Sequence, residues 1–88
     1  MLMENSTDLN AGIIQRHIAY LRKIDKMGKL GLCGWFTDYA GGMVVINADC
    51  YDEADQISKA DPFIAEGYKT YKLRTLERAT LENNYGTE

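Results

Sequence analysis

His17 and Asp61 are the residues of this sequence whose types and settings best suit proton-transfer chemistry. His17 is the single histidine and falls on the apolar side of a predicted helix, where a neutral imidazole exchanges a proton near neutral pH. Asp61 precedes Pro62, which disfavours helical geometry and frees the carboxylate to turn toward a cleft and orient the imidazole. The alternatives are structural: a partly buried His17 bonded to a backbone carbonyl, and an Asp61 that closes its helix. Spacing alone favours the structural roles.

Other side chains are candidates for substrate contact, and each has a commoner structural role. Asp38, in a predicted hairpin loop, is the rival carboxylate, although a turn residue that bonds its own backbone is favoured. Arg16 has the guanidinium geometry that clamps an anionic substrate, and the alternative is a solvated charge on the helix surface. The following aromatic residues would wall an apolar pocket, or pack in the core or at an interface: Trp35, Phe36, Tyr39 and Phe63.

Metal and thiol chemistry are not indicated by the residue pattern. Cys33 and Cys50 are widely separated, and with one histidine the chain has no zinc-ligand spacing and no disulfide framework. Cys33 lacks the neighbouring cation or helix N-terminus that would activate a thiol. No phosphate loop, dinucleotide glycine motif or calcium loop occurs. We therefore expect no metal and no cofactor.

Hydrophobic periodicity predicts the elements that position these residues. A helix ends at Gly28, and a second helix ends near Pro62. Residues 37–42 are predicted as a hairpin loop ending in flexible glycines, and residues 75–88 as a tail or short helix. The predicted order is helix, strand, strand, helix, strand, over residues 13–27, 29–36, 43–46, 51–61 and 68–73. The third of these is apolar on both faces, as in a central strand, and the last has lysines typical of a sheet edge.

This order predicts an α+β fold with an antiparallel sheet. It matches the ferredoxin-like β-α-β-β-α-β pattern without the first strand. Three explanations stay open: the strand lies in a stretch of chain before Met1, residues 1–5 supply a stunted version, or a partner chain fills the gap. The first strand is therefore predicted to be absent or truncated.

Composition limits the class of protein. The chain has 88 residues, 45% of them hydrophobic and 26% charged, with a formal net charge of −3, which predicts one globular domain with its core at about 13–74. The acidic balance argues against nucleic-acid binding. No membrane-spanning or targeting segment is recognised, and free cysteines favour the cytoplasm. A domain this short has a small core, so we expect a homodimer, with a higher oligomer also open.

Several motifs, in order, resemble the YciI-like (YCII-related) family. They are IQRHIAYL at 14–21, GKL at 28–30, GGMVV at 41–45, ADPF at 60–63, and Gly67. The resemblance covers about residues 15–72. It implies a ferredoxin-like fold of the dimeric α/β-barrel type, in which the sheets of two subunits face each other.

The resemblance also implies functional residues. Related muconolactone-isomerase-like and dehydrochlorinase-type enzymes have a proposed His-Asp acid/base pair, which corresponds to His17 and Asp61 in this sequence. The sequence departs from the family at Trp35, where proline is usual, at Cys50, where a capping serine is common, and in the missing first strand.

Two classes of function follow. The first is a small dimeric enzyme acting on a small organic molecule by lyase, isomerase or dehydrohalogenase-type chemistry, with His17 and Asp61 catalytic and Arg16, Trp35, Asp38 and Phe63 contacting substrate. The second is a non-catalytic dimeric module that binds a small ligand or a partner protein, including an accessory domain of a larger assembly.

Overall fold

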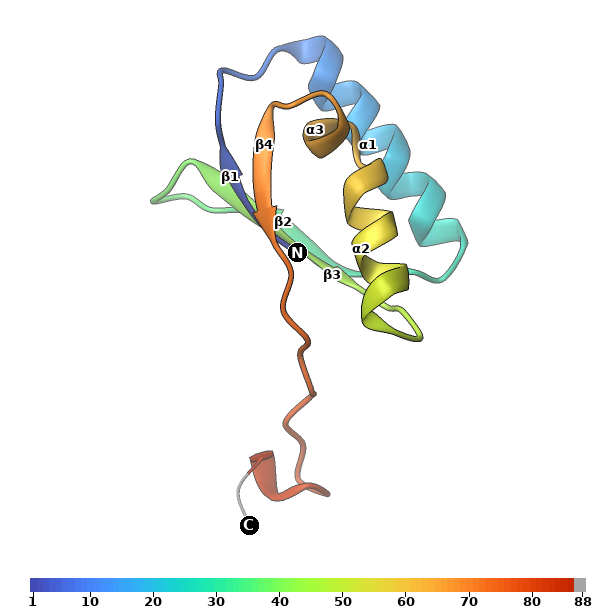
Figure 1. Cartoon of the computed structure of the whole chain (residues 1–88). Helices are drawn as coiled ribbons and strands as arrows, with labels where there is room; N and C mark the ends of the chain where they lie inside the picture. Colours follow the sequence, from blue (N-terminus) through green and yellow to red (C-terminus); the bar gives the residue numbers. More distant parts are fainter. Residues whose placement is uncertain (87–88) are drawn as a thin grey trace.

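Four short strands and three helices follow one another in a β-α-β-β-α-α-β order (Figure 1). The computed structural model describes residues 1–86. Its elements are β1 (Leu2–Asn5), α1 (Ala11–Lys26), β2 (Leu30–Trp35), β3 (Gly41–Ile46), α2 (Tyr51–Ala60), α3 (Pro62–Ala65), β4 (Lys69–Lys72) and the 3-10 turn η1 (Asn84–Gly86). The α+β fold class predicted from the sequence is confirmed.

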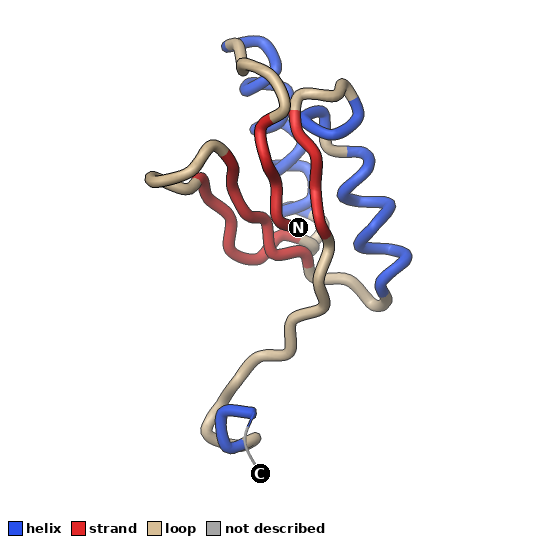
Figure 2. Tube along the Cα trace, turned by 60° about the vertical axis from the view of Figure 1, so that its left-hand side comes forward, coloured by secondary structure: helices blue, strands red, loops and turns tan. Residues whose placement is uncertain are grey.

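The strands form one antiparallel sheet in the order β2-β3-β1-β4. This order is that of a ferredoxin-like fold, and it confirms β3 as a central strand and β4 as an edge strand. The helices all lie on one face of the sheet, and no described segment covers the other face (Figure 2). The sheet therefore has one buried and one open face.

The first strand is present and short, so of the three explanations the stunted strand is the one observed. β1 lies between β3 and β4, with Met3 opposite Gly42 on one side and Tyr71 on the other. Four residues carry too little alternation to be recognised as a strand. The strand forms because both of its edges are paired with other strands.

Gly41 and Gly42 belong to β3, so the prediction that they end a flexible loop is wrong. A Cβ atom on Gly41 would collide with the backbone carbonyl of Met3, and one on Gly42 would lie 2.6 Å from the carbonyl oxygen of Gly34. The two glycines let the backbones of β1, β2 and β3 approach closely at this point. The connecting loop is correspondingly shorter, over residues 36–40.

The hydrophobic core lies between the sheet and the helices. Ile13 of α1 and Val44 of β3 are fully buried, and Phe63 of α3 joins them. α1 begins at Asn10, whose side chain accepts a hydrogen bond from the N–H of Ile13, and ends before Gly28 with its φ of +74°. These caps fix the register in which α1 presents its inner face to the core.

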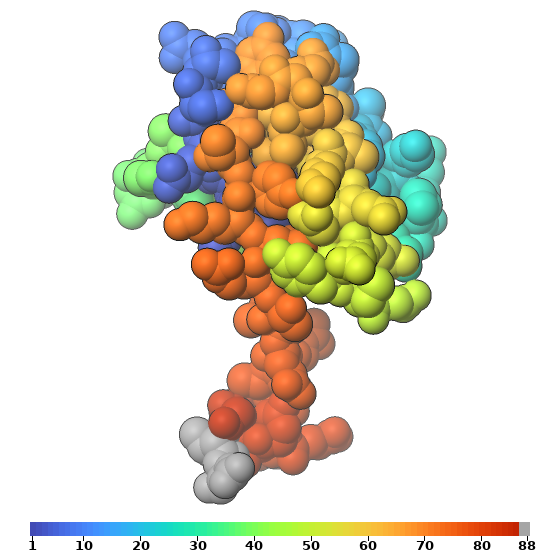
Figure 3. All heavy atoms as spheres, viewed as in Figure 1, coloured from blue at the N-terminus to red at the C-terminus, as the bar shows by residue number. Residues whose placement is uncertain are grey.

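Residues 75–82 do not form the short helix predicted as one possibility. After Leu73 the chain leaves the sheet and stands away from the body of the molecule (Figure 3). Leu76 and Leu81 are 78% and 77% exposed there. A helix in this segment would have no surface on which to bury its apolar side. Over the described part of the chain, none of the helices has the length and apolar character needed to cross a membrane.

Candidate active site

His17 lies on the inner face of α1. It follows the buried Ile13 by one helical turn, and Ile24 continues the same face two turns later. Only 9% of the residue is exposed. The predicted placement of His17 on the apolar side of this helix is therefore confirmed.

Asp61 lies at the junction of two helices. Its backbone is extended, with φ −62° and ψ 127°, because the ring of Pro62 disfavours helical geometry in the residue before it. This bend ends α2 and turns the side chain back, so that its Oδ1 accepts a hydrogen bond of 2.9 Å from the N–H of Phe63 and caps α3. Pro62 at the first helical position therefore sets the direction of the carboxylate.

The structure brings His17 and Asp61 together. The distance between Nδ1 of His17 and Oδ1 of Asp61 is 2.8 Å. The carboxylate accepts this bond when Nδ1 carries the proton, which leaves Nε2 as the basic nitrogen of a neutral ring. Among residues 1–86, the imidazole makes no hydrogen bond to a backbone carbonyl, which was the alternative.

The two members of the pair differ in their access to solvent. The side chain of His17 is 11% exposed and that of Asp61 is 1% exposed. Oδ2 of Asp61 is buried and has no hydrogen-bond partner among the described residues. The imidazole is therefore the member that a molecule arriving from solvent meets first.

Aromatic and charged groups surround the pair. The ring of Phe63 stacks on the imidazole, with 3.9 Å between ring centroids and 22° between planes. Nζ of Lys69, a residue only 7% exposed, lies 4.3 Å from the centroid of the Phe63 ring. Tyr20 donates a hydrogen bond to the carbonyl of Ile57, and its pKa is raised by burial and by the negative charge of Asp61.

Arg16 is next to His17 in sequence but is already paired. Its Nε and Nη2 donate to the two carboxylate oxygens of Glu66 at 3.0 and 2.7 Å. This bidentate bond raises the pKa of Arg16. An anionic substrate would have to displace Glu66 before Arg16 could clamp it.

The remaining predicted contact residues are not in this cluster. Trp35 is 81% exposed at the end of β2, beside a shallow hollow that includes Leu32 and Met43. Asp38 is exposed in the loop between β2 and β3. Of the predicted site residues, Phe63 is therefore the one that the structure adds to the pair.

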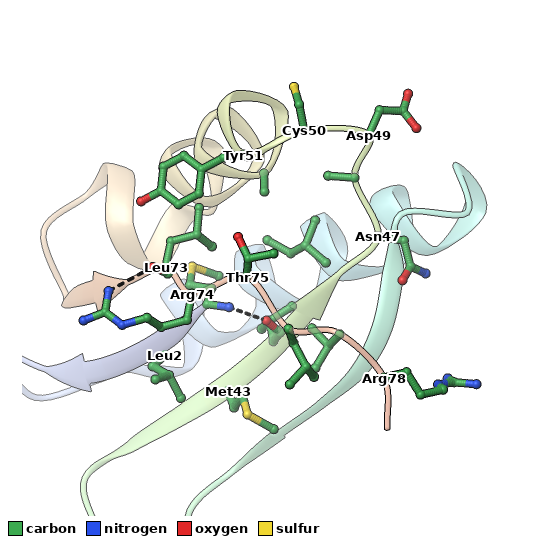
Figure 4. A pocket seen from close by; sticks show the side chains of 17 residues that line it. Leu2, Met43, Asn47, Asp49, Cys50, Tyr51, Leu73, Arg74, Thr75 and Arg78 are labelled. Carbon is green, nitrogen blue, oxygen red and sulfur yellow. Dashed lines mark hydrogen bonds between the residues drawn. The ribbon is translucent and has the colours of Figure 1, made fainter. Parts of the chain in front are cut away.

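A larger hollow of about 520 Å³ lies at one end of the sheet. In Figure 4, Leu2 and Met43 line one side of it, Tyr51 at the start of α2 lies opposite, and Leu73 with Arg74 leads into the tail. His17 and Asp61 are not among its lining residues. Within residues 1–86, no group of three His, Cys, Asp or Glu side chains could hold a metal ion.

Sequence reasoning missed two residues near the pair, Glu66 and Lys69. The alternation of the last strand was the available signal for Lys69, because Lys69, Tyr71 and Leu73 fall on one face and Leu73 is apolar. Glu66 gave no such signal, since its contact with Arg16 joins residues 50 positions apart.

Comparisons with known proteins match the chain to a family and to one relative. Residues 2–77 match the model of a family described as the YCII-related domain. The uncharacterized protein YjpA of Bacillus subtilis (strain 168) is 34% identical over 79 residues, covering 84% of this chain and 93% of that protein. No solved structure matches the chain.

Proposed function

The chain belongs to the YCII-related domain family, and we propose that it is a small-molecule enzyme with His17 as general acid or base and Asp61 as its orienting partner. The reactions that fit are proton transfers of the lyase, isomerase or dehydrohalogenase type. In each, a proton leaves carbon beside an electron-withdrawing group, and a neutral imidazole is a suitable acceptor.

The observation that carries this proposal is the 2.8 Å hydrogen bond between Nδ1 and Oδ1. A carboxylate on Nδ1 fixes the tautomer in which Nε2 is unprotonated, and it stabilises the imidazolium formed when Nε2 takes a proton. The different exposure of the two side chains fits these roles. Asp61, the orienting group, is buried, and His17, the reacting group, retains contact with solvent.

We propose further that the enzyme is a homodimer acting in the cytoplasm. The open face of the sheet carries Leu2 at 42% exposure, and β2 adds Leu32 at 71%. A second copy would cover these apolar side chains. Cys33 and Cys50 are exposed free thiols, which persist in a reducing compartment.

A second candidate is a non-catalytic module that binds a small ligand. The hollow of about 520 Å³ favours it, because this space is lined by apolar side chains such as Leu2 and Leu73 together with Arg74 and Arg78. Such a hollow suits an apolar molecule with one anionic group. The two candidate functions use different sites on the molecule, since His17 does not line the hollow.

Proton transfer in heavy water tests the enzyme. Wild-type protein is incubated in D2O with small lactones, halogenated compounds and carbonyl compounds, and deuterium incorporation or elimination is followed by NMR. We expect turnover with at least one class. In His17→Gln, the new amide can still bond Asp61 but cannot act as a base. The rate of deuterium incorporation or elimination should therefore fall by at least about 100-fold.

Lys72→Met is the control, because Lys72 is exposed on β4 and takes no part in the cluster. Its rate should equal that of the wild type. Equal rates in wild type and His17→Gln would exclude His17 as the base. The ligand-binding module would be favoured if a compound of the panel binds without turnover, and if Arg74→Ala weakens this binding while His17→Gln does not.

A further inference from the structure

The tail that follows β4 carries apolar side chains that a single chain leaves exposed. Leu76 and Leu81 are 78% and 77% exposed, and residues 73–80 form no helix and no strand. The radius of gyration is 14.1 Å, whereas a compact chain of this length has about 12 Å. The tail accounts for the difference, because it stands away from the body (Figure 3). The fold of one chain therefore does not bury these two leucines.

The tail runs outward and turns at its far end (Figure 1). Residues 68–85 contain no glycine and no proline, so no residue typical of a tight reversal stands next to the sheet. In the turn at the far end, Oδ1 of Asn83 accepts a hydrogen bond of 2.8 Å from the N–H of Thr80. The Asn83 amide donates to the carbonyl of Arg78 at 2.7 Å. Leu81 lies inside this turn, so residues 74–82 form an arm with a leucine near its end.

A shallow apolar hollow of about 180 Å³ lies on the open face of the sheet. Gly34 in its lining pairs with Met43 of β3, and Val44, the next residue, is buried toward the helices. The side chain of Met43 therefore points to the open face. Leu32 and Trp35, at 71% and 81% exposure, also line the hollow. A Cβ atom on Gly34 would meet nothing within 4 Å, so this glycine leaves space for an apolar side chain from elsewhere.

The hollow of the same chain is a poor target for the arm. Lys72, from which the arm leaves, pairs with Leu2 of β1. Leu2 pairs with Met43, which in turn pairs with Gly34. The hollow thus lies on the same row of the sheet as the root of the arm. To reach it, the arm would have to reverse directly after Leu73, where the sequence has no turn residue.

A second copy of the chain is within reach of an outward arm. Residues 74–79 span about 20 Å when extended. Neighbouring strands lie about 4.8 Å apart, so β4 and β2 are about 14 Å apart, and two facing sheets are about 10 Å apart. The arm is therefore long enough to cross the sheet of a facing copy and bring Leu81 to its hollow. Since pairs of identical chains associate about a two-fold axis, the contact would be made twice.

We propose that residues 74–82 are an arm exchanged between two copies, and that the arm of each chain lies on the open sheet face of the other with Leu81 in the hollow beside Gly34. Leu76 packs on the same face. The inference rests on the proposed homodimer and names the contact that holds it together. Burial of both leucines of each arm stabilises the dimer, while the fold of a single chain gains nothing from them.

Cross-linking tests which chain receives the arm. Cys33 lines the hollow and is an exposed free thiol, so Leu81→Cys places a second thiol near it if the arm is docked. In a Cys50→Ser background, a short bismaleimide should join two chains, and peptide mass spectrometry should locate the link between position 81 and Cys33. A link within one chain would overturn the proposal, because the arm then folds onto its own sheet. The absence of any link between these positions would overturn it as well.

Two controls accompany the cross-linking. The Cys50→Ser protein without Leu81→Cys should give no covalent dimer, and neither should the Leu81→Cys protein that also carries Cys33→Ser. An equal yield of covalent dimer in either control would show that other thiols are joined and would overturn the proposal.

The dimer dissociation constant, measured by sedimentation, tests the energetic role of the arm. Leu76→Asn together with Leu81→Asn should raise this constant at least about tenfold, and Glu77→Gln together with Glu82→Gln, in the same segment, should leave it unchanged. Gly34→Leu fills the hollow and should weaken the dimer too. Combined with the leucine variant, Gly34→Leu should add nothing further, because both remove one contact. An unchanged constant in the leucine variant, an equal rise in the glutamine variant, or additive effects would overturn the proposal.

The outcome is separable from that of the proposed function. A dimer that is indifferent to the two leucines would refute the arm and leave the homodimer. A wild-type protein with the mass of one chain would refute both. Neither measurement needs a substrate, so the roles proposed for His17 and Asp61 are tested independently.

Discussion

Asp61 has three roles at one position, in that it ends α2, caps α3 and bonds His17. The sequence predicted the first role from Pro62, and it predicted the inner placement of His17 from the spacing of apolar residues. Spacing could not establish the bond between them, because the partners are 44 positions apart and the helices that carry them meet only in the folded chain. Their pairing came from the family resemblance. The pairing of Arg16 with Glu66 escaped prediction for the same reason.

Removing the carboxylate of Asp61 should destabilise the fold. Asp61→Ala deletes the cap of α3 and leaves Nδ1 of His17 buried without a partner. The free energy of unfolding, measured by urea denaturation, should fall by about 2–4 kcal/mol. Asp38→Ala, at an exposed loop position, should stay within about 0.5 kcal/mol of the wild type. Equal stabilities for the two variants would show that the buried bond contributes nothing.

At the scale of elements, the helices with strong local periodicity were predicted from the sequence. The strand that depends on long-range pairing was not. α1 and α2 have capping or stop signals and an apolar face, so their positions were predicted closely. β1 is a strand because β3 and β4 lie on either side of it. The glycines at 41–42 look like loop residues in sequence, and only the closeness of the neighbouring backbones explains their place in a strand.

Gly41 should tolerate no side chain. Gly41→Ala places a methyl group against the carbonyl of Met3, so β1 and β3 must separate. We expect a loss of about 1–3 kcal/mol in the free energy of unfolding. Gly34→Ala is the matched control, because a Cβ atom there meets nothing within 4 Å. A fully stable Gly41→Ala protein would contradict the close approach of the two strands.

Acid should loosen the attachment of α2 to its neighbours. The pKa of Asp55 is lowered by hydrogen bonds from Tyr71 and Lys59, and that of Glu53 by hydrogen bonds from Lys29 and the N–H of Asp49. A carboxyl whose pKa is lower in the folded state stabilises the fold above its unfolded pKa. This stabilisation is lost as pH falls through the folded pKa.

The free energy of unfolding of the wild type should therefore decrease as pH falls from about 5 toward about 2. The double variant Asp55→Asn, Glu53→Gln should be less stable at neutral pH and show a shallower decrease, measured by urea denaturation at each pH. Parallel curves for the two proteins would mean that these ion pairs do not act on stability.

At the scale of the whole molecule, two groups of exposed apolar side chains bear on assembly. One is the sheet, where Leu2 and Leu32 are exposed, and the other is the tail, where Leu76 and Leu81 stand away from the body (Figure 3). A chain this small buries a limited fraction of its surface by itself. Both observations support the proposed homodimer.

Light scattering of the protein at micromolar concentration should give the mass of two chains. Leu32→Glu places a charge on the proposed interface and should shift the mass toward one chain, while Asp38→Ala should leave it unchanged. A wild-type protein with the mass of one chain would exclude the homodimer.

The central claim is that Asp61 orients His17 for proton transfer, and Asp61→Asn tests it most directly. Asparagine can still cap α3 through its carbonyl oxygen, but its NH2 group donates to Nδ1 and forces the proton onto Nε2. The rate of deuterium incorporation into a substrate identified with the wild type should fall by at least about 100-fold in a folded Asp61→Asn protein, as expected for the wrong tautomer. An unchanged rate in that folded protein would contradict the claim.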